Sequence, residues 1–261
     1  MKLCSLASGS RGNASYLTHG QSHFLIDAGI SKKNIEKELE VLESSGEKIN
    51  AVFITHEHID HIKGLGPFLR KYPVSVYLTA GTLDAIERCG NLGAVNQSLF
   101  SVISPGKDYN INGITVRAIT TDHDAAEPVA YRFTTEEGSL AVVTDLGTYN
   151  ENTVNELKGI QGCIIEANHD IRMLEMGPYP YRLKLRILGK TGHLSNDDCV
   201  KLINALRSSN LNQIILGHLS MENNLPDIAY ETVRQGLIEE GAAIPEIYVA
   251  GQYEHSEWIC V

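Results

Sequence analysis

Short apolar runs separated by turn-forming residues recur along the whole chain. They are rich in Val, Ile and Leu and are bounded by Gly, Asn, Asp or Pro, which is typical of β-strands. The runs occur in both halves of the sequence, which fits two sheets packed on each other better than one parallel sheet. The predicted strands are Leu3–Ser5, Ser15–Thr18, His23–Asp27, Ala51–Thr55, Val74–Leu78, Ile114–Ile119, Val129–Thr134, Ser139–Thr144, Gly162–Glu166, Gln213–Leu216 and Glu246–Val249.

Between these runs, apolar residues recur at the spacing of amphipathic helices. Ser195 is a predicted N-cap, and Gly241 follows the last long helix. The stretch Asn168–Thr191 has neither pattern and is predicted to be irregular. The sequence contains no repeat or linker, so we predict one compact α/β domain over residues 1–261. The predicted helices are Lys33–Glu43, Gly64–Lys71, Thr82–Cys89, Glu151–Leu157, Asn196–Arg207 and Pro226–Glu239.

The composition is that of an ordinary globular protein, with 43% hydrophobic and 21% charged residues. No segment approaches the roughly 18 uninterrupted apolar residues that span a bilayer. The N-terminus lacks the apolar run of a signal peptide. The five cysteines are scattered without a CxxC pair, which predicts buried free thiols in a reducing compartment. We therefore expect a cytoplasmic protein that does not bind membranes.

The net charge of −10 argues against a protein that binds nucleic acid nonspecifically through a basic surface. A phosphodiester substrate is still compatible with this charge, because bound divalent cations reverse the local field at a site.

Four side chains that can bind metal lie close together, directly after the predicted strand Ala51–Thr55. They form the pattern HxHxDH at His56, His58, Asp60 and His61. Residues that follow a strand lie at the edge of a sheet, where several side chains can converge. Imidazole and carboxylate groups suit Zn²⁺ and Mn²⁺. A lone HxH is commoner without a metal, but the full pattern predicts a site that can hold two divalent ions.

The stretch THEHIDHIKG resembles the signature of the metallo-β-lactamase superfamily in its two-metal hydrolase form. Further motifs of that superfamily follow in order: LIDAG at 25–29, TDHD at 121–124, VTDLG at 143–147 and LGHLS at 216–220. The resemblance implies the α/β fold of this superfamily, an αββα four-layer sandwich. It also implies two divalent metal ions, Mn²⁺ or Zn²⁺, as cofactors.

The resemblance implies a role for each matching side chain. Asp27 would orient the metal-binding loop, and Asp60 would orient the attacking water. Two metals would activate a shared hydroxide and clamp both sides of the displacement. Asp145 stands where many β-lactamases have cysteine, which favours phosphodiester or ester cleavage. The implied ligands are His56, His58 and His123 for one metal, Asp60, His61 and His218 for the other, and Asp145 between them.

Within the superfamily, the chain resembles the YycJ/WalJ group, whose members are regarded as metal-dependent 5′→3′ DNA exonucleases linked to mismatch repair. The resemblance implies a two-metal phosphodiester hydrolase that acts on DNA as a 5′→3′ exodeoxyribonuclease in repair. The matching stretches are LASGSRGNASY at 6–16, EANHD at 166–170, YP at 179–180, GHLSN at 192–196 and GHLS at 217–220.

Other functions remain compatible with these motifs. A small-molecule phosphodiesterase, such as a cyclic-phosphate hydrolase, shares the HxHxDH set. An RNA-processing hydrolase and a metal-binding sensor without activity are further alternatives. The sensor is disfavoured because every ligand is present.

His193 is a candidate catalytic acid. It precedes Ser195, so an anion there would meet free backbone N–H groups and an imidazole together. The spacing alone is equally compatible with a histidine that packs at the helix start. In related phosphodiesterases a histidine at this place contacts the scissile phosphate and protonates the leaving oxygen, and the resemblance implies that role.

Three further segments are candidates for substrate contact. The loop Ser8–Asn13 is explained by a tight hairpin alone, and the resemblance suggests that it lies beside the metals. Residues 168–170 form either a strand-end turn or a wall of the active site. The basic cluster before His193 is either a solvated helix face or a strip that guides DNA phosphates, and Tyr179 and Tyr181 could stack on a base. The candidate substrate-binding residues are Ser10, Asn13, Asn168, His169, Ser195, Lys184 and Arg186.

Overall fold

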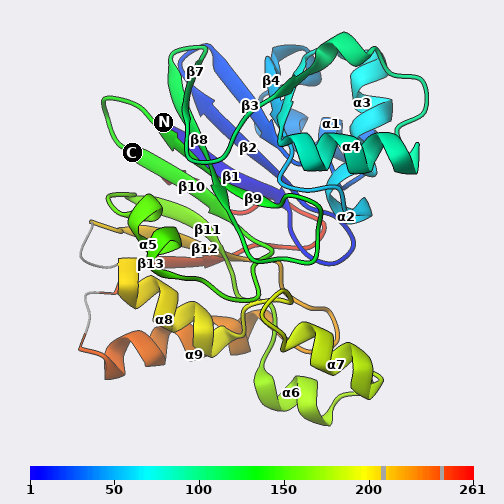
Figure 1. The fold of residues 1–261 in the computed structure, drawn as a ribbon. Coiled ribbons are helices and arrows are strands. Elements are labelled where there is room, and N and C mark those ends of the chain that lie inside the picture. Colours follow the sequence, from blue (N-terminus) through cyan, green and yellow to red (C-terminus); the bar gives the residue numbers. More distant parts are fainter. Residues whose placement is uncertain (207–209, 242–243) are drawn as a thin grey trace.

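The computed structural model describes residues 1–206, 210–241 and 244–261 of the chain. Within these residues, two seven-stranded sheets lie face to face, and helices cover the outer face of each (Figure 1). This arrangement confirms the predicted αββα sandwich. In the described part of the chain, no helix is long and apolar enough to cross a membrane.

The first sheet has the strand order β14-β1-β2-β3-β4-β5-β6. β14, β1, β2 and β3 pair antiparallel. From β3 to β6 neighbouring strands run parallel. The strands are β1 (Lys2–Ala7), β2 (Ala14–His19), β3 (Ser22–Ile26), β4 (Ala51–Phe53), β5 (Ser75–Leu78), β6 (Phe100–Val102) and β14 (Ile259–Cys260).

The second sheet repeats this mixture in the order β13-β12-β11-β10-β9-β8-β7. β7, β8, β9 and β10 pair antiparallel. From β10 to β13 the strands run parallel. They are β7 (Asp108–Ile111), β8 (Ile114–Thr120), β9 (Val129–Thr134), β10 (Ser139–Val143), β11 (Gly162–Glu166), β12 (Gln213–Gly217) and β13 (Glu246–Val249).

The helices form two outer layers (Figure 1). The first sheet is covered by α1 (Lys32–Val41), α2 (Ile59–Ile62), α3 (Leu65–Lys71) and α4 (Ala80–Cys89), with the short 3-10 helices η1 (Gly46–Lys48) and η2 (Gln97–Leu99). The second sheet is covered by α5 (Glu151–Leu157), α8 (Asn196–Leu206) and α9 (Pro226–Glu239). Beyond the end of this layer project α6 (Ile171–Met176) and α7 (Tyr181–Ile187).

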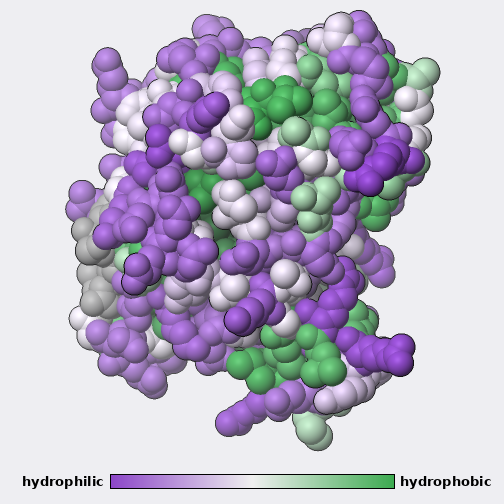
Figure 2. Space-filling view, in the orientation of Figure 1, coloured by the Kyte–Doolittle hydropathy of each residue, from purple (hydrophilic) through white to green (hydrophobic). Residues whose placement is uncertain are grey.

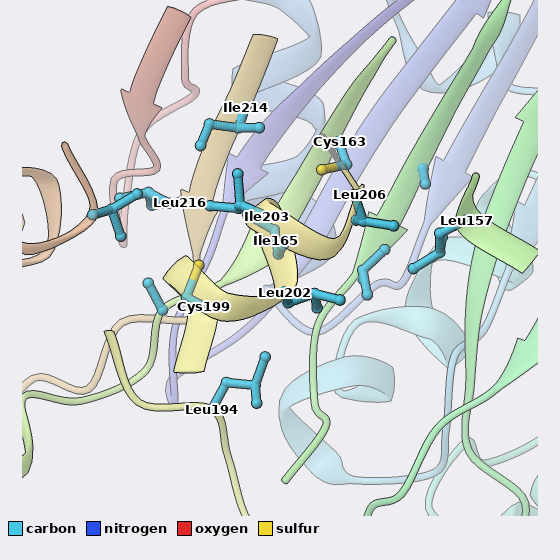
Figure 3. Close-up of a cluster of buried hydrophobic side chains, with 14 of the residues drawn as sticks. Leu157, Cys163, Ile165, Leu194, Cys199, Leu202, Ile203, Leu206, Ile214 and Leu216 are labelled. Atoms are coloured by element: carbon cyan, nitrogen blue, oxygen red, sulfur yellow. The ribbon is translucent and has the colours of Figure 1, made fainter. Parts of the chain in front are cut away.

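Three hydrophobic clusters fill the spaces between the four layers. One lies under α1–α4, one between the sheets, and one under α5, α8 and α9. Figure 3 shows the last of these, in which Leu202 and Leu206 of α8 join Ile165 of β11 and Leu216 of β12. Each layer therefore buries its apolar face, which is what a four-layer sandwich requires.

The predicted strands and helices are present, with small differences at their ends. The predicted end of α8, Arg207, lies outside the described residues. Ser195 caps α8, since its hydroxyl accepts the N–H of Asp198 at 3.1 Å. Gly241 has a φ of +66°, a left-handed conformation that favours glycine after a helix.

Among the described residues, three strands, three α-helices and both 3-10 helices were not predicted: β6, β7, β14, α2, α6, α7, η1 and η2. The edge strands are short and partly exposed, so they lack an apolar run. The prediction that Asn168–Thr191 is irregular was wrong, because it contains α6 and α7. α7 has no buried residue and therefore no apolar face that a helical pattern would reveal. Cys89 and Cys260 are exposed, which corrects the prediction that all five free thiols are buried.

Aromatic rings from both sheets meet in the middle of the core. The ring of Phe53, at the end of β4, lies 5.1 Å from that of Phe24 and 5.4 Å from those of Tyr131 and Phe133. Phe53 thus packs β4, the strand that leads into the HxHxDH loop, against the second sheet.

Replacing Phe53 by alanine should lower the free energy of unfolding by about 3–5 kcal/mol, because it leaves a cavity that the rigid sheets cannot close. Denaturant unfolding measures this change. Ile238→Ala, at an exposed position of α9, should change stability by no more than about 0.5 kcal/mol. Equal stabilities of the two variants would contradict the central position of Phe53.

Candidate metal centre

The strands that lead to the predicted ligands end at the same edge of the sandwich. β3 and β4 are parallel, as are β10, β11 and β12. β8 runs in the same direction as β10, because two antiparallel pairings separate them. The residues that follow or close these strands are Asp27 after β3, the HxHxDH loop after β4, His123 after β8, Asp145 after β10, Glu166 at the end of β11 and His218 after β12.

The HxHxDH loop is held tightly by backbone contacts. His58 is the N-cap of α2, so Asp60 and His61 lie in its single turn. The carbonyl of Asp60 accepts the N–H of Asn13 at 2.7 Å. Gly29 packs on the same carbonyl so closely that a Cβ there would lie 1.6 Å from the oxygen. Only glycine fits at this position.

Side chains that are far apart in the sequence form overlapping groups, within each of which the donor atoms lie within 4.8 Å of one another. All seven predicted metal ligands are among them, and Asp145 belongs to two groups. The groups are His56 with His58 and His123; Asp60 with His61 and His218; His56 with His61 and Asp145; and Asp145 with Glu166, His193 and His218.

In three buried histidines one ring nitrogen is held and the other has no partner. Nδ1 of His56 lies 3.0 Å from the hydroxyl of Thr55, and Nδ1 of His123 lies 3.0 Å from the carbonyl of Gly192. Nδ1 of His218 lies 2.7 Å from the carboxylate of Glu166. Among the described residues, Nε2 of all three finds no hydrogen-bond partner. Such orphaned buried atoms are rare, and histidines that bind metal are held by their other nitrogen. These residues therefore fit divalent metal ions.

His61 and His58 are held in a similar way. Nδ1 of His61 donates to the Asp27 carboxylate at 2.8 Å, and that carboxylate also accepts the N–H and hydroxyl of Thr55. His58 is held instead by Nε2, which lies 3.2 Å from the Asp124 carbonyl, so Nδ1 is the nitrogen left for a metal. Asp27 thus ties the end of β3 to both ends of the HxHxDH loop.

Backbone strain is concentrated in this cluster. Asp27, Asp145 and His218 have φ values of 60°, 60° and 54°, in the left-handed region that non-glycine residues seldom adopt. Such a conformation costs about 1–3 kcal/mol and persists where the surrounding structure imposes it, often at functional sites. The side chains of these three residues are therefore held in directions that a relaxed strand end would not give.

Glu166 is the residue of this cluster that was not predicted. Its buried carboxylate accepts Nδ1 of His193 at 2.8 Å and Nδ1 of His218 at 2.7 Å. Burial disfavours its charged form, but the two imidazoles outweigh burial and hold the pKa of Glu166 well below its usual range. The available signal was its place as the last residue of a predicted strand, at the edge where the predicted ligands gather.

Neighbouring imidazoles in the cluster have opposite pKa shifts. Burial lowers the pKa of His56 well below its usual range, and the adjacent His61 lowers it further. Burial acts on His61 as well, but the carboxylates of Asp145 and Asp27 raise its pKa to about 9. Buried carboxylates therefore dominate one half of the cluster and attract positive charge, which suits divalent cations.

Comparison with known proteins agrees with this geometry. Residues 22–218 match the family model of the beta-lactamase superfamily domain. The structure of the metallo-β-lactamase fold protein YhfI from Bacillus subtilis is similar, with a TM-score of 0.72 over 97% of this chain and 98% of that one. At 14% identity this likeness concerns the fold alone. The chain belongs to the β-lactamase superfamily and has the metallo-β-lactamase fold.

Two relatives narrow this membership to the YycJ/WalJ group. Exodeoxyribonuclease WalJ of Streptococcus pneumoniae serotype 2 (strain D39) is 38% identical over 228 residues, which cover 87% of this chain and 85% of the relative. Exodeoxyribonuclease YycJ of Bacillus anthracis is 37% identical over 244 residues, which cover 93% and 91% of the two chains. The chain is therefore a member of this group.

The metallo-β-lactamase fold places the predicted substrate contacts at different depths. Asn13 is buried, and its amide nitrogen lies 3.0 Å from Nε2 of His61. Ser10, in the same loop, is exposed. His193 is partly exposed at the edge of the cluster.

The remaining candidates make hydrogen bonds within the protein, except for the His169 ring, whose two buried nitrogens find no partner among the described residues. Asn168 donates to the carbonyl of His218 at 2.8 Å, and His169 is buried beside it. The hydroxyl of Ser195 serves as the helix cap. The ammonium of Lys184 donates to the carbonyls of Glu175 and Gly177, and the guanidinium of Arg186 donates to the carboxylate of Asp124. That these residues bind substrate stays a prediction.

Replacing Asp27 by asparagine should lower divalent-metal affinity about 10- to 100-fold, because a neutral amide holds the His61 ring less firmly than a carboxylate does. Competition with a chromophoric chelator measures the affinity, and circular dichroism checks the fold. The matched control is Asp84→Asn, at an exposed acid on α4. An unchanged affinity in Asp27→Asn would contradict the orienting role.

Proposed function

We propose that the chain is a two-metal phosphodiester hydrolase that acts as a 5′→3′ exodeoxyribonuclease in DNA repair. One observation carries the proposal: the buried Nε2 atoms of His56, His123 and His218 have no hydrogen-bond partner among the described residues. These atoms belong to the cluster that also contains Asp145 and His193. The printed names of WalJ and YycJ support DNA as the substrate. The free cysteines support a reducing, cytoplasmic location.

Seven residues would hold the metals. His56, His58 and His123 form one group of donors, Asp60, His61 and His218 form the other, and Asp145 lies between them. Bound Mn²⁺ or Zn²⁺ would supply a hydroxide nucleophile and neutralise charge on the phosphate. The absence of cysteine from these groups favours hard or borderline ions and is consistent with phosphoester chemistry.

His193 is suited to protonate the leaving oxygen. Because Glu166 accepts from its Nδ1, Nε2 is the nitrogen that remains for the substrate. The ring is partly exposed, so a phosphodiester at the metal centre can reach it. Glu166 is a positioning residue, since it fixes the ring without facing the substrate.

Asp60 is suited to orient the attacking water. Burial raises the pKa of its carboxyl, but the neighbouring imidazoles of His218 and His61, 3.7 and 3.8 Å away, hold that pKa well below its usual range. The group is therefore an ionised acceptor at neutral pH, as an orienting group must be.

The direction of digestion tests the proposal. Incubated with Mn²⁺ and double-stranded DNA, the protein should release the label at once from a 5′-labelled strand. It should shorten a 3′-labelled strand stepwise. Denaturing electrophoresis resolves these products, and His58→Ala is the inactive control. Turnover of cyclic or other small diesters without loss of DNA would instead identify a small-molecule phosphodiesterase.

His193→Ala should keep its metal content and lose about 10²- to 10⁴-fold in the rate of DNA cleavage, because it removes a general acid and no predicted ligand. Metal analysis and single-turnover cleavage measure the two properties. His19→Ala is a matched control, because His19 lies outside the cluster. A His193→Ala protein with the wild-type rate would rule out the acid role.

A further inference from the structure

The segment Ile171–Lys190, which contains α6 and α7 and is called the arm below, begins and ends at the metal centre. Glu166 lies before it and His193 after it, and these two side chains are 2.8 Å apart. Thr191, next to the arm, accepts the N–H of Asp124 at 3.1 Å. The chain therefore leaves the metal centre at the start of the arm and returns to it at the end (Figure 1).

Polar contacts hold the arm in place. The ammonium of Lys184 on α7 donates to the carbonyls of Glu175 and Gly177, at 2.7 and 2.8 Å, which locks α7 onto the end of α6. Arg186 pairs with Asp124, whose backbone carbonyl contacts His58. Lys184 and Arg186, two candidates for phosphate contact, thus fasten the arm to itself and to the metal centre.

Apolar side chains of the arm remain uncovered. α7 has no buried residue, and α6 has a single buried residue, Leu174. Figure 2 shows hydrophobic side chains gathered over α6 and α7. The exposed ones are Met176 (87%), Tyr181 (74%), Leu185 (51%) and Leu188 (45%).

The arm is also the basic part of an acidic chain. It carries five cationic side chains against the single carboxylate of Glu175, in a protein whose net charge is −10. Three of the cations, Arg172, Arg182 and Lys190, are exposed and make no hydrogen bond or ion pair within the described ranges. Free positive charge and uncovered apolar surface therefore occur together beside the metals.

We propose that the arm binds the DNA strand that enters the metal centre. Its bases pack on Tyr181 and Leu185, and its phosphates pair with Arg182. DNA is the occupant that combines flat apolar faces with regularly spaced negative charge. Symmetric pairing with a second copy of the chain would instead bring like-charged arms together. The inference rests on the proposed function and names the surface through which the protein selects DNA.

The test compares DNA with a diester too small to reach the arm. Tyr181→Ser/Leu185→Ser in the metal-loaded protein should raise KM for DNA about tenfold, because stacking is lost. It should leave kcat/KM for bis(p-nitrophenyl) phosphate unchanged. Arg182→Ala should lower the slope of log KM against log salt by about one. The matched controls are Val41→Ser/Ile238→Ser and Arg88→Ala, at exposed positions away from the arm.

Each outcome decides the proposal. If the wild type digests DNA and the arm variants have the same KM for DNA as the wild type, the arm's role is overturned and the proposed function stands. Equal losses on both substrates overturn it too, because they indicate damage to the metal centre. Hydrolysis of the small diester but not of DNA by the wild type overturns the proposed function and the arm's role together. Sedimentation that shows a wild-type dimer, converted to monomer by Tyr181→Ser/Leu185→Ser with KM unchanged, identifies a self-association surface instead.

Discussion

Two buried carboxylates, Asp27 and Glu166, fix the direction in which histidine rings of the metal centre point. A neutral imidazole carries one N–H, and the group that accepts it determines which nitrogen keeps a lone pair. Asp27 accepts from His61, and Glu166 accepts from both His218 and His193. Asp27 comes from the first sheet and Glu166 from the second. The geometry of the centre therefore depends on how the two sheets pack, which is why aromatic packing around Phe53 matters well away from the metals.

The same dependence explains which parts of the site were visible in the sequence. HxHxDH is visible because one loop supplies four donors, and the ordered motifs added His123, Asp145 and His218. Glu166 is a single acid at the end of an apolar strand, and although it opens the matching stretch EANHD, that stretch does not show that its carboxylate accepts from two histidines. Its role appears only when β11 is placed between β10 and β12, a pairing between distant segments.

The fold was predictable to a similar extent, and for related reasons. Buried elements have a pattern that the sequence reveals: β10 is a continuous run of buried residues, and α8 has an apolar face at helical spacing. The arm has no such face, so its helices lacked the signal that identified the others. Lys184 and Arg186 stand out in the sequence as part of a basic cluster, but their bonds to Glu175, Gly177 and Asp124 depend on the fold of the arm and cannot be predicted from spacing.

On the proposed function, the arm that selects the substrate and the histidine that donates the proton are neighbours in the chain. His193 follows the arm directly, and its orientation depends on Glu166, which precedes the arm. Arg186 ties the arm to Asp124, and the carbonyl of Asp124 holds the ring of His58. A strand bound to the arm is thereby placed relative to the acid and to one predicted metal ligand at once. An acidic protein needs no basic surface elsewhere for this purpose, because the arm and the bound cations supply positive charge only where the phosphodiester must lie.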